Sequence, residues 1–589
     1  MPDARERGRV YRSEHALRTS SGAPQRPPAG TDTGPGPGSG PPGKADGGEP
    51  VADEFGNVAG HSAVMAVGSI VSRLTGFLRT VIIAAALGST LVGDAYTTAQ
   101  FFPNMIYELL LGGILTSVLV PVLVRARRTD PDRGEAYTDR LVSLAVLALA
   151  AATVLAVTAA PLLVWLVWQD PGSRGLVTAL SYLILPTIFF YGMAGILTAV
   201  LNTRGHFAAP MWAPILNNLV VIATFALYLA LFGPEAPTAG DMAASKIVLA
   251  GGGTLLGIVV QAFGLAPALR RVGFTLRWRT DFRALRLREL GRLGGWMFCY
   301  IGLNQVSVLV VMRLLGIARA RGEDGILIFN QTYLLMMMAH GIVAVSVIIA
   351  LLPRMSAASA DLRHHDLVAD LSRGARTITA VLAPIAVAYV VLAAPITVAL
   401  FQRGAFLPEH AQVMAPVLVV AGLALIPYSL SQLSVFAFYA LPDTRTPALV
   451  NIGVVALRVA VQVGLFVILT ASLAVAAVFI GYAVSFLAAG VIMAWLLRRR
   501  LGPLGLRTVG TTLGRVGLAA AGAAVAGWLT VWLLPGADPL TTGQALVQLI
   551  VGGAVVAGGY VGLATLLRID EVHAVLDLVR RKVLRGAPR

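Results

Sequence analysis

The sequence predicts an all-α polytopic membrane protein with 14 transmembrane helices, built as two six-helix pseudo-symmetric halves plus two extra C-terminal helices. Of the 589 residues, 56% are hydrophobic and only 13% are charged, and the mean hydropathy is +0.76. Apolar runs of 20 to 30 residues recur along nearly the whole chain. A soluble domain carries about 25% charged residues, and a transmembrane barrel would instead show alternating strands of about ten residues.

The first 60 residues have a different composition from the rest. Between Ser21 and Pro50, 17 of 30 residues are Gly or Pro, and no hydrophobic period is present. Such a segment buries too little apolar surface to offset the entropy of ordering. We therefore expect a disordered cytoplasmic tail over residues 1–60, and the lack of an apolar core argues against a cleavable signal peptide.

Fourteen apolar spans follow the tail, each long enough to cross a bilayer. Their approximate limits are 61–86, 94–124, 141–168, 176–202, 208–233, 246–269, 291–316, 325–352, 377–401, 411–440, 447–470, 473–497, 513–534 and 544–567.

Basic residues alternate between successive loops. If the N-terminus is cytoplasmic, the inner loops and the C-terminal tail hold 30 Arg and Lys residues, counted together with the first three residues of the spans that follow them. The outer loops, counted in the same way, hold 5. The positive-inside rule then places both termini in the cytoplasm. A wrong helix count would scramble this alternation. Basic inner loops also explain the net charge of +16 without nucleic acid as a partner.

Short segments recur at offsets near 235 residues. Leu119-Val120-Pro121 is matched by Leu351-Leu352-Pro353, and Thr203-Arg204 by Thr444-Arg445. Two such repeats of six helices would share one orientation and face each other across a central site, as in transporters. The expected parts are a tail (1–60), two six-helix halves (61–271 and 272–500), helices 13 and 14 (501–568) and a basic cytoplasmic C-tail (569–589).

Motifs for catalysis are missing from the sequence. There is no G-x-x-x-x-G-K-[ST] phosphate loop, no H-E-x-x-H metal spacing and no Ser-His-Asp arrangement at membrane depth. The single cysteine, Cys299, allows no intramolecular disulfide. We therefore expect neither an enzyme nor a metal or cofactor site, and leave a coupling ion or the membrane potential open as the driving force.

Charged residues do occur inside the first two spans: Arg73, Arg79, Asp94 and Glu108. Each costs about 2.5–3.5 kcal/mol at the bilayer centre on insertion scales, so such residues usually face a cavity. Two guanidinium groups suit a phosphate-bearing anion. Arg73 and Arg79 lie about 120° apart on a straight helix, and a helix break near Thr75-Gly76 would turn both into one cavity. Alternatively, the arginines pair with Asp94 and Glu108 and only fix the helices.

Further polar residues lie in later spans. Arg458 in span 11 is deep enough to face a cavity, whereas Arg313 near the end of span 7 could simply reach the interface. Asn217, Asn218 and Asn304 are expected to join helices by hydrogen bonds more than to line a cavity.

Several motifs resemble those of one transporter family. Ser72-Arg73-Leu74-Thr75-Gly76-Phe77-Leu78-Arg79, Gly93-Asp94-Ala95-Tyr96 and Phe102-Pro103-Asn104 resemble the opening of the MurJ/MviN lipid II flippases. Phe401-Gln402-Arg403-Gly404-Ala405-Phe406 and Asp443-Thr444-Arg445-Thr446-Pro447 are similar to later family motifs. The likeness covers about residues 61–500.

The resemblance implies a member of the multidrug/oligosaccharidyl-lipid/polysaccharide exporter superfamily in the bacterial cytoplasmic (inner) membrane. Such a flippase moves undecaprenyl-pyrophosphate-linked peptidoglycan precursor, lipid II, from the inner to the outer leaflet by alternating access, in service of the cell wall. By motif position, Arg73 and Arg79 would line a cationic cavity and Asp94 would be its acid. Ser72, Gly76 and Asn104 match other motif positions. Cell-wall synthesis proteins are possible partners.

The chain also departs from the family pattern. Tyr107-Glu108 stands where many members have an Arg pair, Leu334 stands at the family's span-8 arginine, and Thr80 replaces an acid. The cavity is therefore expected to be less cationic, with Arg458 or Arg313 as compensating charges. Two alternatives stay open: an exporter of another lipid-linked oligosaccharide or small molecule, and a non-transporting scaffold for cell-wall assembly.

Overall fold

The computed structural model describes residues 68, 71–109, 123, 126–127, 130–132, 134–206, 208–233, 240, 242–285, 287–323, 325–470, 473–537, 539–574 and 576–577. All of them belong to one compact unit, Ala59–Arg589. The tail expected over residues 1–60 and the last 12 residues of the expected C-tail lie outside the described residues.

The described residues are helical almost throughout, as the sequence predicts. In a bilayer only a helix satisfies its backbone groups within one segment, and long apolar runs therefore fold this way. Twelve described helices are long and apolar enough to cross a membrane, and they coincide with expected spans 3 to 14. Residues 71–87 and α2 (Leu91–Glu108) are described parts of spans 1 and 2.

The first helix group comprises the helix over residues 71–87, α2, α4 (Glu135–Thr158), α5 (Ala160–Val167), α6 (Arg174–Ile184), α7 (Thr187–Thr203), α8 (Ala208–Phe232), α9 (Ala244–Phe263) and α10 (Ala266–Arg271). After the short 3₁₀ helix η3 (Phe282–Leu285), the second group comprises α11 (Leu287–Ala320), α12 (Ile326–Ala360), α13 (His364–Val391), α14 (Ala393–Phe401), α15 (Pro408–Ala440), α16 (Arg445–Ile468) and α17 (Ala474–Leu501). The chain ends with α18 (Leu506–Leu533) and α19 (Thr542–Leu566).

Several expected spans consist of two helices with a break between them. Span 3 is α4 and α5, with Pro161 in the first turn of α5, and span 4 is α6 and α7, with Pro186 at the junction. Proline has no N–H to continue the hydrogen-bond ladder, so the helix stops or kinks there. Hydropathy alone does not detect these breaks because both pieces are equally apolar.

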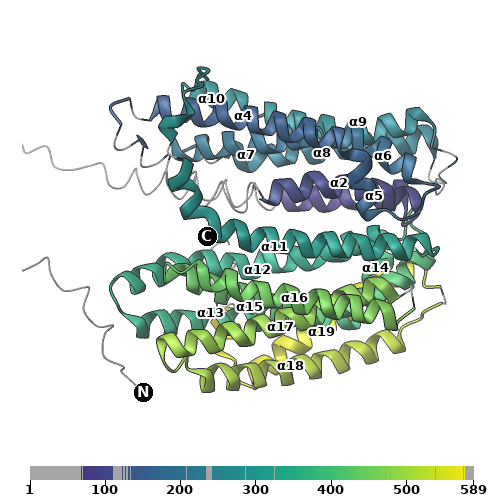
Figure 1. Ribbon diagram of the computed structural model, residues 1–589. Helices are drawn as coiled ribbons and strands as arrows, with labels where there is room; N and C mark the ends of the chain where they lie inside the picture. Colours follow the sequence, from purple (N-terminus) through teal and green to yellow (C-terminus); the bar gives the residue numbers. More distant parts are fainter. Residues whose placement is uncertain are drawn as a thin grey trace, which may run out of the picture. The chain divides into compact units, whose positions relative to one another are not determined.

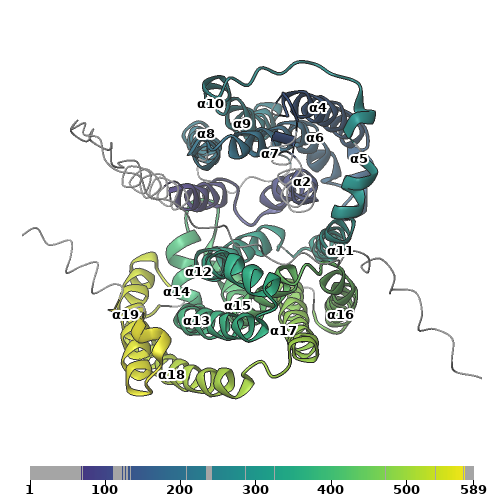
Figure 2. The same ribbon diagram turned by 90° about the vertical axis from the view of Figure 1, so that its left-hand side faces the viewer.

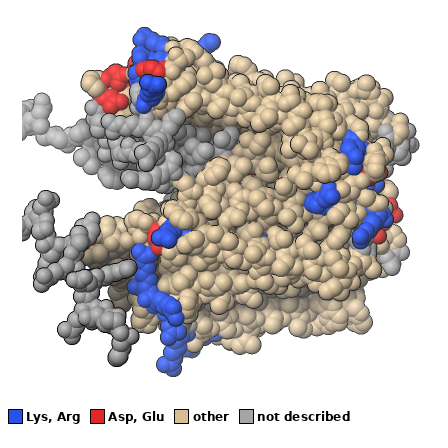
Figure 3. All heavy atoms as spheres, in the orientation of Figure 1, with Lys and Arg blue, Asp and Glu red and all other residues tan. Residues whose placement is uncertain are grey.

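Successive spans alternate in direction and define two ends of the bundle (Figure 1). The Gly88 end carries residues 88–90, 168–173, 321–323, 325 and 402–407. The Arg204 end carries residues 204–206, 272–285 and 361–363. Charged side chains gather at these two ends, and the face between them is almost free of Lys, Arg, Asp and Glu (Figure 3). An uncharged belt of this kind suits the hydrocarbon region of a bilayer.

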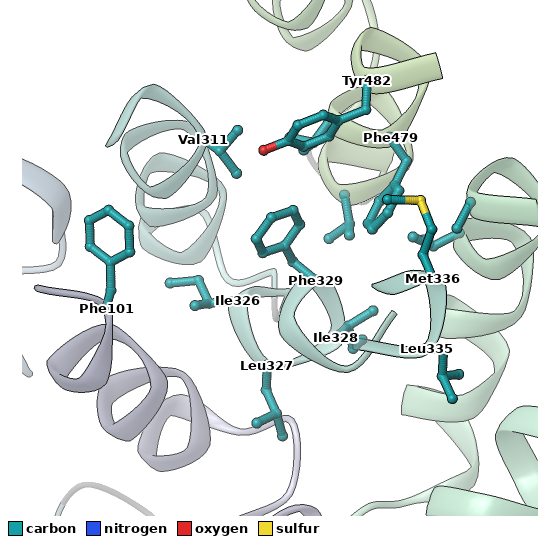
Figure 4. Close-up of a cluster of buried hydrophobic side chains, with 14 of the residues drawn as sticks. Phe101, Val311, Ile326, Leu327, Ile328, Phe329, Leu335, Met336, Phe479 and Tyr482 are labelled. Carbon is teal, nitrogen blue, oxygen red and sulfur yellow. The ribbon is translucent and has the colours of Figure 1, made fainter. Parts of the chain in front are cut away.

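The two helix groups share one apolar core near the Gly88 end. Figure 4 shows Phe101 of α2 and Ile326 of α12 in this cluster with Val311 of α11 and Phe479 of α17. Burial of such side chains contributes about 1.5–3 kcal/mol each. Helices α18 and α19 lie beside α13 (Figure 2). The hydroxyl of Tyr560 in α19 donates to the carbonyl of Ala380 in α13 at 2.7 Å.

Candidate functional site: charged groups between the two helix groups

The first described helix is unbroken through Thr75 and Gly76. The break expected there is wrong: Thr75 Oγ1 donates to the carbonyl of Val71 at 2.9 Å, and Thr80 Oγ1 to that of Gly76 at 2.9 Å. Both are i−4 bonds of the kind that threonine forms inside a helix. Arg73 and Arg79 therefore keep their separation of about 120° around the axis.

Gly76 and Ser72 lie against α8. The amide of Asn218 donates to the Ser72 carbonyl at 3.2 Å and to Thr75 Oγ1 at 3.0 Å. A Cβ at Gly76 would be 3.4 Å from the same amide nitrogen. Asn218 thus joins two helices, as expected, and Gly76 is where they approach. Neither Ser72 nor Gly76 shows a described partner from the second helix group.

Arg73 reaches the second group. Its Nη2 donates to the carbonyl of Gly341 in α12 at 3.4 Å, and a Cβ at Gly341 would lie 2.5 Å from Nη1. The guanidinium is half-buried on α12, about 21 Å from the Gly88 end by helical rise. It forms no ion pair with any described acid.

Arg79 points toward the first group instead. It lies within electrostatic range of the hydroxyls of Tyr96 and Tyr191. Its Nε is buried and has no hydrogen-bond partner among the described residues. A buried donor without a partner costs free energy of about 1–3 kcal/mol, so an acceptor for this nitrogen would have to come from outside the described residues.

Asn104 and Glu108 lie one turn apart on α2, and both side chains are exposed. Glu108 has no ion pair within the described part of the chain. It is within electrostatic range of Tyr333 in α12 and Tyr428 in α15, which both belong to the second group. By helical rise, Arg73 and Glu108 lie at similar depths, about 21–25 Å from the Gly88 end.

Asp94 lies elsewhere, at the Gly88 end. Its side chain is 0% exposed, and its carboxylate accepts from the backbone N–H of Gly325 at 3.2 Å and of Leu327 at 2.7 Å. These are orphan donors at the start of α12, where the helix dipole also favours an anion. Asp94 therefore caps a helix of the opposite group, and it has no hydrogen bond or ion pair to Arg73 or Arg79.

Other bonds between the groups also lie toward the Gly88 end. The Ala405 N–H donates to the Ala85 carbonyl at 2.8 Å, and Gln331 Nε2 to that of Thr80 at 3.3 Å. Gly88 and Gly404 both have positive φ, and a Cβ at either would collide with the opposite backbone. The two backbones therefore touch directly at this end.

Arg313 at the same end donates to the carbonyls of Trp165 at 3.3 Å and Leu166 at 2.9 Å. It thus closes the last turn of α5, and its partners here are backbone oxygens.

Arg458 is buried inside the second group, with 3% of its surface exposed. Its Nε donates to Ser485 Oγ at 3.0 Å and Nη1 to Asn304 Oδ1 at 3.2 Å. The guanidinium also lies 4.8 Å from the Tyr482 ring centre and 5.0 Å from that of Phe486. Neutral oxygens and aromatic faces therefore replace a carboxylate as partners of this cation.

The connection between the groups is attached to the first. Arg140 Nη2 and Asp281 Oδ2 are 2.7 Å apart, and the Arg277 N–H donates to Asp139 Oδ1 at 3.3 Å. The hydrogen bond from Arg140 lowers the pKa of Asp281 below its usual value. Residues 272–285 thus form part of the first group's Arg204 end.

The sequence reading did not single out His340. It is buried beside Gly341, its Nδ1 lies 2.9 Å from Ser429 Oγ, and its ring centre is 4.5 Å from that of Tyr428. A histidine inside an apolar run is rare enough to mark a functional candidate, and that signal was present in the sequence. No cluster that could hold a metal ion occurs within the described ranges.

Comparison with known proteins agrees with this architecture. The family described as "Lipid II flippase MurJ" matches residues 83–537. A lipid II flippase MurJ of Burkholderia cenocepacia is 28% identical over 392 residues, which cover 66% of this chain and 74% of the relative. A probable lipid II flippase MurJ of Rhizobium meliloti is 28% identical over 534 residues, with 88% and 94% covered.

Among solved structures, a lipid II flippase MurJ in an inward closed conformation has a TM-score of 0.68 at 18% identity, covering 86% of this chain and 99% of that one. At this identity the match speaks for the fold. The family match over residues 83–537 is a separate observation from this structural similarity. The chain therefore belongs to the MurJ family of lipid II flippases.

Proposed function

We propose that this protein is a transporter that moves lipid II from the inner to the outer leaflet of the bacterial cytoplasmic membrane by alternating access. In this proposal both termini are cytoplasmic, so the Arg204 end faces the cytoplasm and the Gly88 end faces outward. The proposal rests on family membership and on the charge distribution along helix 71–87 and α2.

The observation that carries the site is that, among the described residues, neither Arg73 nor Arg79 has an acid as a partner. Two arginines that only fixed helices would be expected to pair with nearby carboxylates, because an uncompensated buried cation is costly. Instead, within the part of the chain that the structure describes, Arg73 donates to the Gly341 carbonyl and Arg79 Nε has no hydrogen-bond partner. We assign both guanidinium groups to the pyrophosphate of the substrate, which can accept several charge-assisted hydrogen bonds.

The remaining candidate residues have different roles in this proposal. Glu108 and Asn104 would lie near the sugar-bearing head group, on the exposed face of α2. Asp94 would hold the outward end closed by capping α12. Ser72 and Gly76 would position the arginine helix against α8, and Arg458 would maintain the packing of α11, α16 and α17 around a buried positive charge.

Replacement of the native flippase in a depleted bacterium tests the proposal. Wild-type protein should restore lipid II in the outer leaflet, whereas Arg73→Ala/Arg79→Ala should reduce its appearance at least about 100-fold, as expected when two charge-assisted contacts are lost. The matched control is Arg270→Ala/Arg271→Ala, two exposed arginines on α10, which should retain activity.

Equal rescue by the wild type and the Arg73/Arg79 variant would refute the assigned site. No rescue despite verified membrane expression would instead favour export of another lipid-linked oligosaccharide. The replacements at Tyr107-Glu108 and Leu334 give that alternative its support.

A further inference from the structure

An apolar groove of about 260 Å³ lies between α13, α15, α17 and the start of α18, and its lining includes none of Arg73, Arg79, Asp94 and Glu108. Its walls are mainly aliphatic and aromatic. They include Leu371 on α13, Leu430 and Leu433 on α15, Phe486 and Leu497 on α17, and Leu504 before α18. The groove adjoins the Arg204 end, because α13 and α18 begin there and α15 and α17 end there.

The length of the groove matches one leaflet of a bilayer. Along α17 the lining extends from Phe486 to Leu497, which is about 16 Å at a rise of 1.5 Å per residue. The hydrocarbon core of a bilayer is about 30 Å thick, so the acyl chains of one leaflet reach about 15 Å. A chain anchored at the Arg204 end would fill the groove without passing the midplane.

Three arginines adjoin lining residues of the groove in the sequence. Arg373 follows the lining residue Ser372, Arg498 follows Leu497, and Arg507 lies between Leu504 and Val509. All three are exposed, and none forms an ion pair with an acid in the described part of the chain. Neighbouring arginines do pair: Arg376 with Glu571 at 2.9 Å and Arg500 with Asp443 at 2.6 Å.

We propose that this groove binds a membrane phospholipid with an anionic head group, with an acyl chain between α15 and α17 and the phosphate at Arg373, Arg498 and Arg507. Guanidinium groups bind phosphate in bidentate fashion, and basic residues at the end of a helix attract anionic lipids. The groove shares no lining residue with the proposed pyrophosphate site at Arg73 and Arg79. The proposal therefore does not depend on which substrate the protein transports.

The bound lipid would stabilise the second helix group. Phe486 forms part of the groove wall and also covers the buried Arg458 guanidinium at 5.0 Å. An acyl chain against this ring would hold α17 to α13 and α15 and link α18 to the group. The loop before α18 is close by, since a Cβ at Gly505 would lie 3.9 Å from Ser372 Oγ.

Native mass spectrometry of the full-length protein tests the proposal with phosphatidylglycerol and phosphatidylcholine of identical acyl chains. The wild type should bind phosphatidylglycerol at least about tenfold more tightly. Arg373→Gln/Arg498→Gln/Arg507→Gln should abolish this preference. The control Arg270→Gln/Arg271→Gln/Arg283→Gln changes three exposed arginines of the first group at the same end, and it should keep the preference.

A second pair of variants tests the groove itself. Gly490 lines it, and a Cβ there meets nothing within 4 Å, so Gly490→Leu should fill the groove without a clash and block both lipids. Gly464→Leu on α16, where space is equally open, should bind like the wild type.

The proposal would be overturned if the control arginine variant lost the preference for phosphatidylglycerol equally. It would also be overturned if Gly490→Leu bound both lipids like the wild type, because either result would mean ordinary contact with surrounding lipid. Displacement of phosphatidylglycerol by undecaprenyl phosphate, one for one, would also overturn it, because the groove would then hold a polyprenyl chain. These are binding measurements, so failure of the flippase proposal would leave their outcome unchanged.

Discussion

Helix α2 carries two acids in opposite situations. Asp94 is completely buried and accepts two backbone N–H bonds from the start of α12, whereas Glu108, about 21 Å further along the helix, is exposed and has no described ion pair. A buried carboxylate is tolerated when amides and a helix dipole compensate it. Asp94 therefore closes the interface between the helix groups. Glu108, at the depth of Arg73, has no described partner for its charge.

Substitution of Asp94 should give the largest effect. Asp94→Ala leaves two buried N–H groups of α12 without an acceptor, so we expect the free energy of unfolding to fall by about 3 kcal/mol and lipid II transport to fall to background. Thermal or denaturant unfolding in detergent measures the first effect, and leaflet labelling of lipid II measures the second. Asp94→Asn, which keeps one acceptor oxygen, should be intermediate.

Asp132 provides the control for this variant. Its carboxylate also accepts two backbone N–H bonds, from Gly134 at 3.0 Å and Ala136 at 2.8 Å, but within one exposed segment. Asp132→Ala should cost about 1 kcal/mol or less. Similar losses for the two variants would contradict the importance of bonding between the helix groups.

A smaller effect is expected where α12 meets Arg73. Gly341→Ala puts a Cβ 2.5 Å from Arg73 Nη1, which must move because it is the end of a flexible side chain. Helix propensity should raise stability by up to about 1 kcal/mol, while transport should fall about three- to tenfold as the guanidinium shifts. Gly453→Ala on α16, where a Cβ meets nothing, should raise stability and leave transport intact. Unchanged transport in Gly341→Ala would contradict the proposed role of Arg73 in substrate binding.

Glu108→Gln should have the smallest effect on the fold. Since Glu108 has no described ion pair, its replacement should change the free energy of unfolding by less than about 0.5 kcal/mol. Binding of lipid II should tighten by about two- to tenfold because one negative charge near an anionic head group is removed. Glu409→Gln, an exposed acid at the Gly88 end, serves as control. If Glu108→Gln lost as much stability as Asp94→Ala, both acids would have a structural role and the comparison would fail.

Much of the fold could be predicted because bilayer insertion depends on apolar length, which hydropathy measures directly. Spans 3 to 14 coincide with described helices. The helix breaks at Pro161 and Pro186 were not predicted because they change backbone hydrogen bonding and leave the hydropathy unchanged. The predicted break at Gly76 was wrong because a glycine in a membrane helix can equally serve close packing, here against Asn218.

The candidate site was less predictable because side-chain partners come from distant sequence. Asp94 caps amides more than 230 residues later, which no local pattern reveals. Likewise, the position of Arg458 between Ser485 and two rings depends on how α16 packs on α17. The charge at each position could be read from the sequence, but the partner that decides its role could not.

The hydrogen bonds between the two helix groups have a consequence for evolution. Each described one uses at least one main-chain atom: the carbonyls of Ala85, Thr80, Trp165, Leu166 and Gly341, and the amides of Gly325, Leu327 and Ala405. Main-chain atoms persist through almost every point mutation, proline at a donor being the exception. Related sequences can therefore diverge to 28% identity and still retain the main-chain hydrogen bonds that align the two helix groups.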